Sequence, residues 1–169
     1  ENLALRGDFV ALLTREIDLK LRALPELAGR PLETIFFGGG TPSLLTPDEL
    51  SQILEHLRSH FTIAPSCEFT MECNPGTVSP SSLAGYRALG VNRLSFGVQS
   101  FDPEELHFLG RIHDAKASRE AVRMAREAGF ENVNIDLIFS LPGQTQATLD
   151  RTLDEAVALE TEHISAYNL

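Results

Sequence analysis

Regular alternation of polar and apolar residues along several short segments constrains the fold of this chain more than any other feature. Polar residues or glycine occupy every second position in 67–73 (CEFTMEC), 93–99 (RLSFGVQ), 133–137 (VNIDL) and 163–167 (HISAY). A period of two is typical of a β-strand with one buried face. We therefore predict strands near 67–73, 91–98, 132–139 and 163–168, after a buried strand at 34–37 that stops at three glycines.

Helical patterns separate these predicted strands. The first covers residues 3–24, where the apolar residues at helical spacing are Leu5, Phe9, Leu12, Leu13, Ile17 and Leu21. The second begins at Thr46, a predicted N-cap that is followed by a proline and two acids. Further helices are expected near 79–89, 103–109, 114–128 and 145–159. Strands that alternate with helices predict βαβ units and a parallel sheet.

An open doubly wound sheet and a (β/α) barrel both contain such units. Central strands of an open sheet are covered on both faces and are apolar throughout, whereas a barrel with a polar lumen explains the alternation. A complete eight-stranded barrel needs about 200–250 residues, and this chain has 169. We therefore predict an α/β fold with a parallel, partial TIM-type barrel, an incomplete arc of about five strands in one domain over residues 1–169. Because the chain opens at Glu1 without a methionine, we expect a piece of a longer protein.

Composition narrows the class of partner. The chain carries 24 acidic and 14 basic side chains, a net charge of −10, which argues against nucleic acid because phosphate binding needs clustered Lys and Arg. No apolar run approaches the roughly 20 residues of a membrane helix, and we expect no signal peptide. We expect no membrane span and a cytoplasmic location. The two cysteines, Cys67 and Cys73, lack CxxC spacing, and we interpret them as core residues of the apolar face.

Candidate binding residues lie where the predicted strands end. Residues 38–40 (GGG) follow the first strand at the end where barrel active sites form, and they either approach a ligand or make a tight turn. Glu72, Gln99 and Asp136 lie at equivalent ends of the next three strands, on the polar face. Two strand-end acceptors suit the paired hydroxyls of a ribose, and Arg111 is a candidate clamp for a carboxylate.

Simpler explanations exist for the strand-end residues and for the histidines of the chain. The strand-end residues could be independent of one another, and Arg93 on the neighbouring strand could satisfy Glu72. His56 and His60 have the i, i+4 spacing of a zinc pair, but we identify no third ligand nearby and interpret them as a solvated helix face. His113 precedes Asp114, a predicted N-cap, and we interpret it as structural.

Five motifs in order resemble the radical S-adenosylmethionine (SAM) family of oxygen-independent coproporphyrinogen III oxidase and its haem-chaperone relative. They are FFGGGTP at 36–42, ECNP at 72–75, RLSFGVQS at 93–100, LGRIH at 109–113, and NIDL through LPGQT at 134–145. The resemblance covers nearly the whole chain, and the closing HISAYNL at 163–169 looks more like the chaperone branch.

The resemblance implies a role for each matched residue. Gly39, Gly40 and Thr41 would bind the amino end of SAM, and Arg111 would hold its carboxylate. Gln99 and Asp136 would hold the ribose hydroxyls. Glu72 would also contact SAM, and Ile138 would lie beside its adenine.

One departure from the family concerns its 4Fe–4S cluster, which three cysteines of a CxxxCxxC loop hold after the first barrel strand. Neither Cys67 nor Cys73 fits that pattern. We expect the chain to begin just after the loop, and to be unable to cleave SAM by itself. A carboxy-terminal domain for porphyrin handling is also expected elsewhere.

The resemblance leaves two functions, and a third does not depend on it. An oxidase would use a 5′-deoxyadenosyl radical to convert two propionates of coproporphyrinogen into vinyl groups with loss of carbon dioxide, and would need an electron donor. A haem chaperone would bind haem and pass it to a haem-acceptor protein. An unrelated barrel enzyme would use the same strand ends for a phosphate or a sugar.

Overall fold

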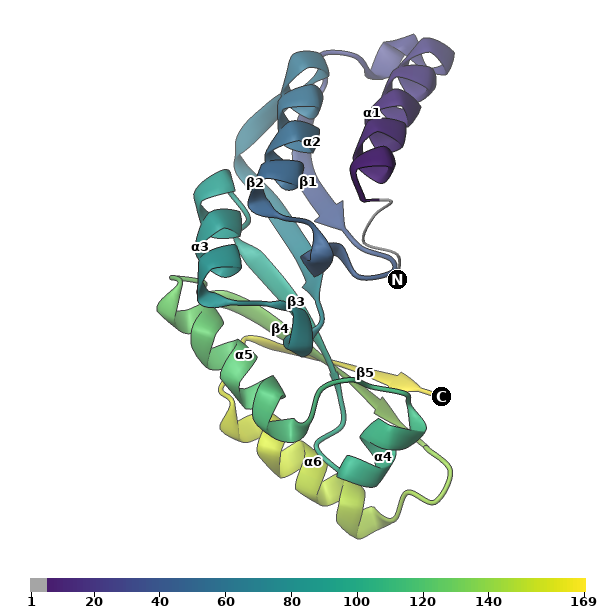
Figure 1. Cartoon of the computed structure of the whole chain (residues 1–169), viewed down its shortest axis with the longest axis vertical. Helices are drawn as coiled ribbons and strands as arrows, with labels where there is room; N and C mark the ends of the chain where they lie inside the picture. Colours follow the sequence, from purple (N-terminus) through teal and green to yellow (C-terminus); the bar gives the residue numbers. More distant parts are fainter. Residues whose placement is uncertain (1–5) are drawn as a thin grey trace.

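Five parallel strands in sequential order form the sheet of this protein. A computed structural model describes residues 6–169 (Figure 1). In that range the sheet order is β1-β2-β3-β4-β5. The strands are β1 (Pro31–Phe37), β2 (Thr62–Cys73), β3 (Arg93–Gln99), β4 (Asn132–Phe139) and β5 (His163–Asn168). The sheet curves without closing on itself, so the predicted partial barrel of five strands is confirmed.

Helices connect each strand to the next. The α-helices are α1 (Arg6–Ala23), α2 (Pro47–His60), α3 (Pro80–Leu89), α4 (Pro103–Phe108), α5 (Ala115–Glu127) and α6 (Gln146–Ala158). Short 3-10 helices lie at η2 (Pro25–Leu27), η3 (Pro42–Leu44) and η4 (Pro75–Thr77). Figure 1 shows α2, α3, α5 and α6 along one side of the curved sheet.

Local signals set the helix boundaries. The Thr46 hydroxyl accepts a hydrogen bond from the backbone N–H of Glu49, and the Glu49 carboxylate accepts one from the backbone N–H of Thr46, which is a capping box. Asp114 caps α5 in the predicted place, and Thr145 caps α6. Gly90 ends α3 with a φ of 107°, a conformation that favours glycine.

The main core lies between the outward face of the sheet and the helices. Its fully buried side chains include Met71, Leu94, Phe96, Val133 and Ile135 from the strands. Cys67 and Cys73 belong to the same cluster, as predicted. Polar residues occupy the alternate positions, on the concave face. Strand alternation has therefore assigned both faces of β2, β3 and β4 correctly.

Helix α1 departs from the expected apolar face. Val10 is buried with Leu45 and Ile53, and Leu13 and Leu57 pack beside them. Phe9 and Leu12, predicted to face inward, are 53% and 62% exposed. Because α1 packs on α2, the positions in line with Val10 and Leu13 are covered, and Phe9 and Leu12 point away. Leu5 of the predicted face lies outside the described residues.

Strand β2 is longer than predicted because its first residues pair separately with β1. Thr62 and Ile63 lie opposite Pro31 and Leu32, and the pairing then shifts so that Thr34 faces Glu68. The irregular segment between them contains Pro65, which cannot donate a ladder hydrogen bond.

In residues 6–169, none of the helices has the length and apolar character that crossing a bilayer requires.

Candidate functional site

The carboxyl ends of the strands surround a cavity of about 310 Å³ on the concave face. The register of the parallel strands aligns polar residues of neighbouring strands, so that Glu72 lies opposite Ser95 and Asp136 lies opposite Ser165. Seven predicted site residues line the cavity: Gly40, Thr41, Glu72, Gln99, Arg111, Asp136 and Ile138. The structure therefore brings together residues that the sequence placed on separate strands and loops.

Gly39 is the predicted site residue that does not line this cavity. Its backbone N–H donates a 2.9 Å hydrogen bond to Oε2 of Glu72. Gly39 and Gly40 have φ angles of 80° and 60°, and a Cβ atom at Gly38 would lie 3.1 Å from Cδ of Glu72. These positions need glycine because the loop turns sharply against a carboxylate. Glu72 thus fixes the shape of the glycine loop.

The alternative partner proposed for Glu72 is wrong. Arg93 donates from Nη1 to the Thr70 hydroxyl at 3.4 Å, and Thr70 in turn donates to Glu68. Arg93 therefore belongs to a polar chain with Thr70 and Glu68 of β2. Glu72 keeps one carboxylate oxygen beyond its bond to Gly39, on the wall of the cavity.

Asp136 is held by a polar network across β3, β4 and β5. The Ser95 hydroxyl donates to Oδ2 of Asp136 at 3.0 Å, and Nδ2 of Asn134 donates to Oδ1 at 2.9 Å. Asn134 also contacts His163 and Ser165 through its carbonyl oxygen. A carboxylate has about four acceptor positions, so Asp136 can accept further hydrogen bonds from a ligand. The sequence placed Ser95 and Asn134 on the polar face without assigning them this role.

Gln99 lies at a bulge that turns its side chain toward the cavity. Between Phe96 and Gln99 the β3 strand advances three positions while β4 advances two, from Ile135 to Leu137. Gln99 has a φ of 70° and is 8% exposed. A Cβ atom at Gly97 would lie 2.8 Å from its Nε2, so glycine makes room for the amide. Bulges and left-handed non-glycine residues concentrate at functional sites.

Arg111 supplies a positive charge with unused hydrogen-bonding capacity. It lines the cavity from the loop after α4, where Gly110 turns the chain with a φ of 63°. Its Nε atom is buried and has no hydrogen-bond partner among residues 6–169. An unpaired buried donor costs about 1–3 kcal/mol. A carboxylate or phosphate in the cavity would pair with this atom and remove that cost.

One wall of the cavity is less polar. Ile138 on β4 lies opposite Tyr167 on β5, and both line the cavity. Tyr167 is missing from the sequence-based set of site residues. Its position on the polar face of β5, one strand from Ile138, is the signal that could have identified it. A planar apolar group can pack against such side chains.

His113 lies near the cavity without lining it. Its Nε2 is 3.1 Å from the carbonyl oxygen of Val98 and donates to it, while Nδ1 is buried with no partner in the described range. Burial lowers the pKa of His113 from 6.5, partly offset by the bond to Val98. A neutral ring that joins the loop to β3 fits its predicted structural role.

Neither cysteine fits a ligand of an iron–sulfur cluster. Cys67 and Cys73 are both buried, and burial raises the pKa of each thiol. Cluster ligands are thiolates, and these are the only cysteines of the sequence. The residues present therefore do not hold such a cluster, although they suit a charged, hydroxyl-bearing ligand.

The expectation that His56 and His60 form a solvated helix face with no third ligand nearby is wrong. Asp18 of α1 contacts both rings, because α1 packs along α2. Sequence spacing could not identify Asp18 since it lies 38 and 42 positions away.

A polar lumen at the carboxyl ends of a partial (β/α) barrel, with a glycine loop after β1, defines the class of this chain. The chain belongs to the Radical SAM superfamily, whose sequence profile matches residues 4–156.

Two sequence relatives within this superfamily carry names connected with haem or porphyrin. The heme chaperone HemW of Escherichia coli (strain K12) is 39% identical over 162 residues, covering 96% of this chain and 42% of the relative. An oxygen-independent coproporphyrinogen III oxidase of Pseudomonas aeruginosa is 35% identical over 162 residues, 95% of this chain and 35% of the relative. The chain thus spans well under half the length of either relative.

Solved structures with a similar fold agree with membership of the Radical SAM superfamily. Coproporphyrinogen III oxidase (HemN) from Escherichia coli superposes with a TM-score of 0.89 at 32% identity, over 99% of this chain and 38% of that protein. The Elp3 protein of Methanocaldococcus infernus has a TM-score of 0.68 at 18% identity, over 94% of this chain and 41% of that protein, and shows a shared fold only.

Proposed function

We propose that the concave face of this chain binds SAM, within a longer radical SAM protein of porphyrin or haem metabolism. The observation that carries the proposal is the Nε of Arg111, which is buried with no partner among residues 6–169, in a cavity that also presents Asp136 and Gln99. SAM combines an amino acid carboxylate, a ribose diol and an adenine. The Arg111 cation matches the carboxylate, and the strand-end acceptors Asp136 and Gln99 match the ribose diol. The less polar wall of the cavity matches the adenine.

Each end of the ligand has its own residues. Arg111 pairs with the carboxylate, and Glu72 with the backbone of Gly40 and Thr41 lies toward the amino group. Asp136 accepts from a ribose hydroxyl while Ser95 and Asn134 keep its carboxylate in place. Gln99 offers its carbonyl to the second hydroxyl, and Ile138 with Tyr167 packs against adenine. Gly39 acts indirectly, through its bond to Glu72.

The 4Fe–4S cluster of the family supplies an electron to the sulfonium of SAM when it is bound. The two cysteines of this chain do not fit the cluster. The role proposed for these residues is therefore binding and orientation of SAM.

For the whole protein we propose an activity like that of the oxygen-independent coproporphyrinogen III oxidases. The structural likeness to HemN, with a TM-score of 0.89, supports it. The second candidate is a haem chaperone, because the relative named HemW in Escherichia coli is 39% identical and the Pseudomonas aeruginosa oxidase is 35% identical. The two functions share the SAM site and differ in what happens to the porphyrin.

The SAM site is tested by calorimetric titration of SAM into the longer, cluster-reconstituted protein. Asp136→Asn keeps the size of the side chain and removes its charge. We expect SAM affinity to fall about 5- to 150-fold, corresponding to about 1–3 kcal/mol for a buried polar partner. Asp154→Asn, on the exposed face of α6, is the matched control and leaves affinity unchanged. Equal dissociation constants for the two variants would remove Asp136 from the site.

The reaction of the whole protein is tested without oxygen, with SAM and an electron donor. Mass spectrometry follows coproporphyrinogen III. Loss of two carboxyl groups, as carbon dioxide, supports the oxidase. Unchanged coproporphyrinogen together with haem that stays with the protein through gel filtration supports the chaperone. Failure of both, with SAM still bound, would contradict the assignment to porphyrin metabolism and leave the SAM site intact.

A further inference from the structure

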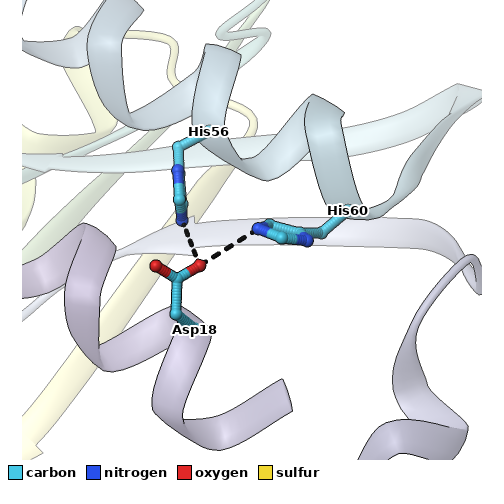
Figure 2. A group of neighbouring side chains, drawn as sticks. All are labelled: Asp18, His56 and His60. Carbon is cyan, nitrogen blue, oxygen red and sulfur yellow. Dashed lines mark hydrogen bonds and ion pairs between the residues drawn. The ribbon is translucent and has the colours of Figure 1, made fainter. Parts of the chain in front are cut away.

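Asp18, His56 and His60 form a cluster of metal-ligating side chains between α1 and α2 (Figure 2). Nε2 of His56 lies 2.9 Å from Oδ1 of Asp18, and Nε2 of His60 lies 3.1 Å from the same oxygen. The three side chains come from two helices. None of them lines the cavity proposed for SAM.

Helix packing explains why the three side chains meet. His56 and His60 are one turn apart on α2, so both rings project from the same face. Asp18 lies on the face of α1 that packs against α2, where Val10 and Leu13 contact Ile53 and Leu57. The apolar contacts fix the two helices, and the three polar groups are thereby held at a set distance.

The spacing of the ligand atoms suits a small divalent cation. Zinc binds histidine nitrogen at about 2.0–2.1 Å and carboxylate oxygen at about 2.0–2.2 Å, with tetrahedral geometry. Ligand atoms at those distances stand about 3.3 Å apart along a tetrahedral edge. The two N–O distances of 2.9 and 3.1 Å are close to that value. All three ligand atoms lie within 4.8 Å of one another.

We propose that Asp18, His56 and His60 bind one Zn²⁺ ion, with water in the remaining position. Two imidazoles and one carboxylate are ligands that zinc accepts. The three side chains are 38%, 26% and 33% exposed, so an ion can enter from solvent and water can complete its coordination. The bound ion joins α1 to α2. This site is independent of the proposed SAM function.

The competing explanation is a direct ion pair or hydrogen bond between Asp18 and the two rings. Both arrangements hold the helices together, but only one takes up metal. The test therefore measures metal directly and uses variants that alter the ligands while keeping the side-chain shape or polarity.

The experiment uses the longer, cluster-reconstituted protein after treatment with a mild chelator. Zinc chloride is added by equilibrium dialysis, and bound zinc is counted by mass spectrometry. We expect the protein to bind one more zinc equivalent than the His56→Gln/His60→Gln variant. Asp18→Asn weakens zinc binding at least tenfold, since it replaces a charged ligand with a neutral one. His107→Gln, an exposed histidine on α4, is the matched control and keeps full zinc binding.

Thermal unfolding supplies a second measurement. We expect zinc to raise the melting temperature of the unaltered protein and of the His107→Gln variant, and to leave that of the double variant unchanged, because binding to the folded state stabilises it. Equal melting temperatures of all variants without zinc show that the substitutions leave the fold intact. Identical zinc stoichiometry in the unaltered protein and the double variant would overturn the proposal in favour of the direct ion pair.

Discussion

Replacing Arg111 with lysine keeps a positive charge at the cavity and removes the planar fork of the guanidinium. In the free protein Nε of Arg111 is buried without a partner in the described range, so the unpaired donor costs the fold about 1–3 kcal/mol. A bound carboxylate satisfies that atom. The Nε–H of Arg111 thus destabilises the ligand-free protein and stabilises the complex with a carboxylate.

The magnitude follows from the number of hydrogen bonds that lysine loses. A bidentate guanidinium makes two charge-assisted bonds to a carboxylate, whereas an ammonium group acts as a point charge. Loss of one such bond costs about 1.5–3 kcal/mol, or about 10- to 150-fold in the dissociation constant for SAM. The free energy of unfolding of the free protein should stay equal or rise, because an unpaired buried donor has been removed.

Calorimetry with SAM gives the affinity, and urea unfolding of the ligand-free protein gives the stability. Arg119→Lys is the control, since Arg119 forms an ion pair with Glu155 at 2.8 Å in which both side chains are 44% exposed. Exposed pairs of this kind contribute about 0–1 kcal/mol. Unchanged SAM affinity in Arg111→Lys, together with a loss of stability, would refute the reasoning and make Arg111 a structural residue.

Three further changes test neighbouring features. Gly97→Ala places a Cβ 2.8 Å from Nε2 of Gln99, so we expect the Gln99 amide to move. SAM affinity should then fall about tenfold while the melting temperature changes little. The control is Gly76→Ala, whose Cβ would have its nearest neighbour at 3.6 Å and which should leave SAM affinity unchanged. Glu105 is a buried acceptor that joins Ser100 at the end of β3 to Gln144 before α6, so Glu105→Ala should lower the free energy of unfolding in urea by about 2–4 kcal/mol; a loss below 1 kcal/mol would contradict that role. Burial lowers the pKa of His113, so the unfolded chain binds the proton more tightly, and stability should fall as the pH drops below 6.5. His113→Gln should flatten that decline, and an unchanged slope would show that another group causes it.

Glu105 illustrates a feature that the sequence did not reveal. It is 6% exposed and accepts hydrogen bonds from the Ser100 hydroxyl at 2.5 Å and from Nε2 of Gln144 at 3.1 Å. It thus joins the end of β3 to the loop before α6, two of the motifs that carry the family resemblance. Nothing in the sequence of α4 distinguishes Glu105 from the exposed Glu104 beside it.

The sequence by itself determined the parallel partial barrel, the two faces of β2, β3 and β4, and the starts of α2 and α5. Alternation along β2, β3 and β4 depends on the geometry of single strands, and the caps at Thr46 and Asp114 depend on neighbours three residues away. Parallel strands then bring their carboxyl ends to one edge, which is why Glu72, Gln99 and Asp136 could be grouped in advance.

Only the tertiary structure decided which partners meet across the helices and between neighbouring strands. Asp18 reaches His56 and His60 because α1 packs on α2, and the same packing exposes Phe9 and Leu12. The unpaired Nε of Arg111 likewise depends on how its loop lies against the cavity. These contacts join residues far apart in the chain, and their distances are set by side-chain packing, which periodicity and local propensity do not encode.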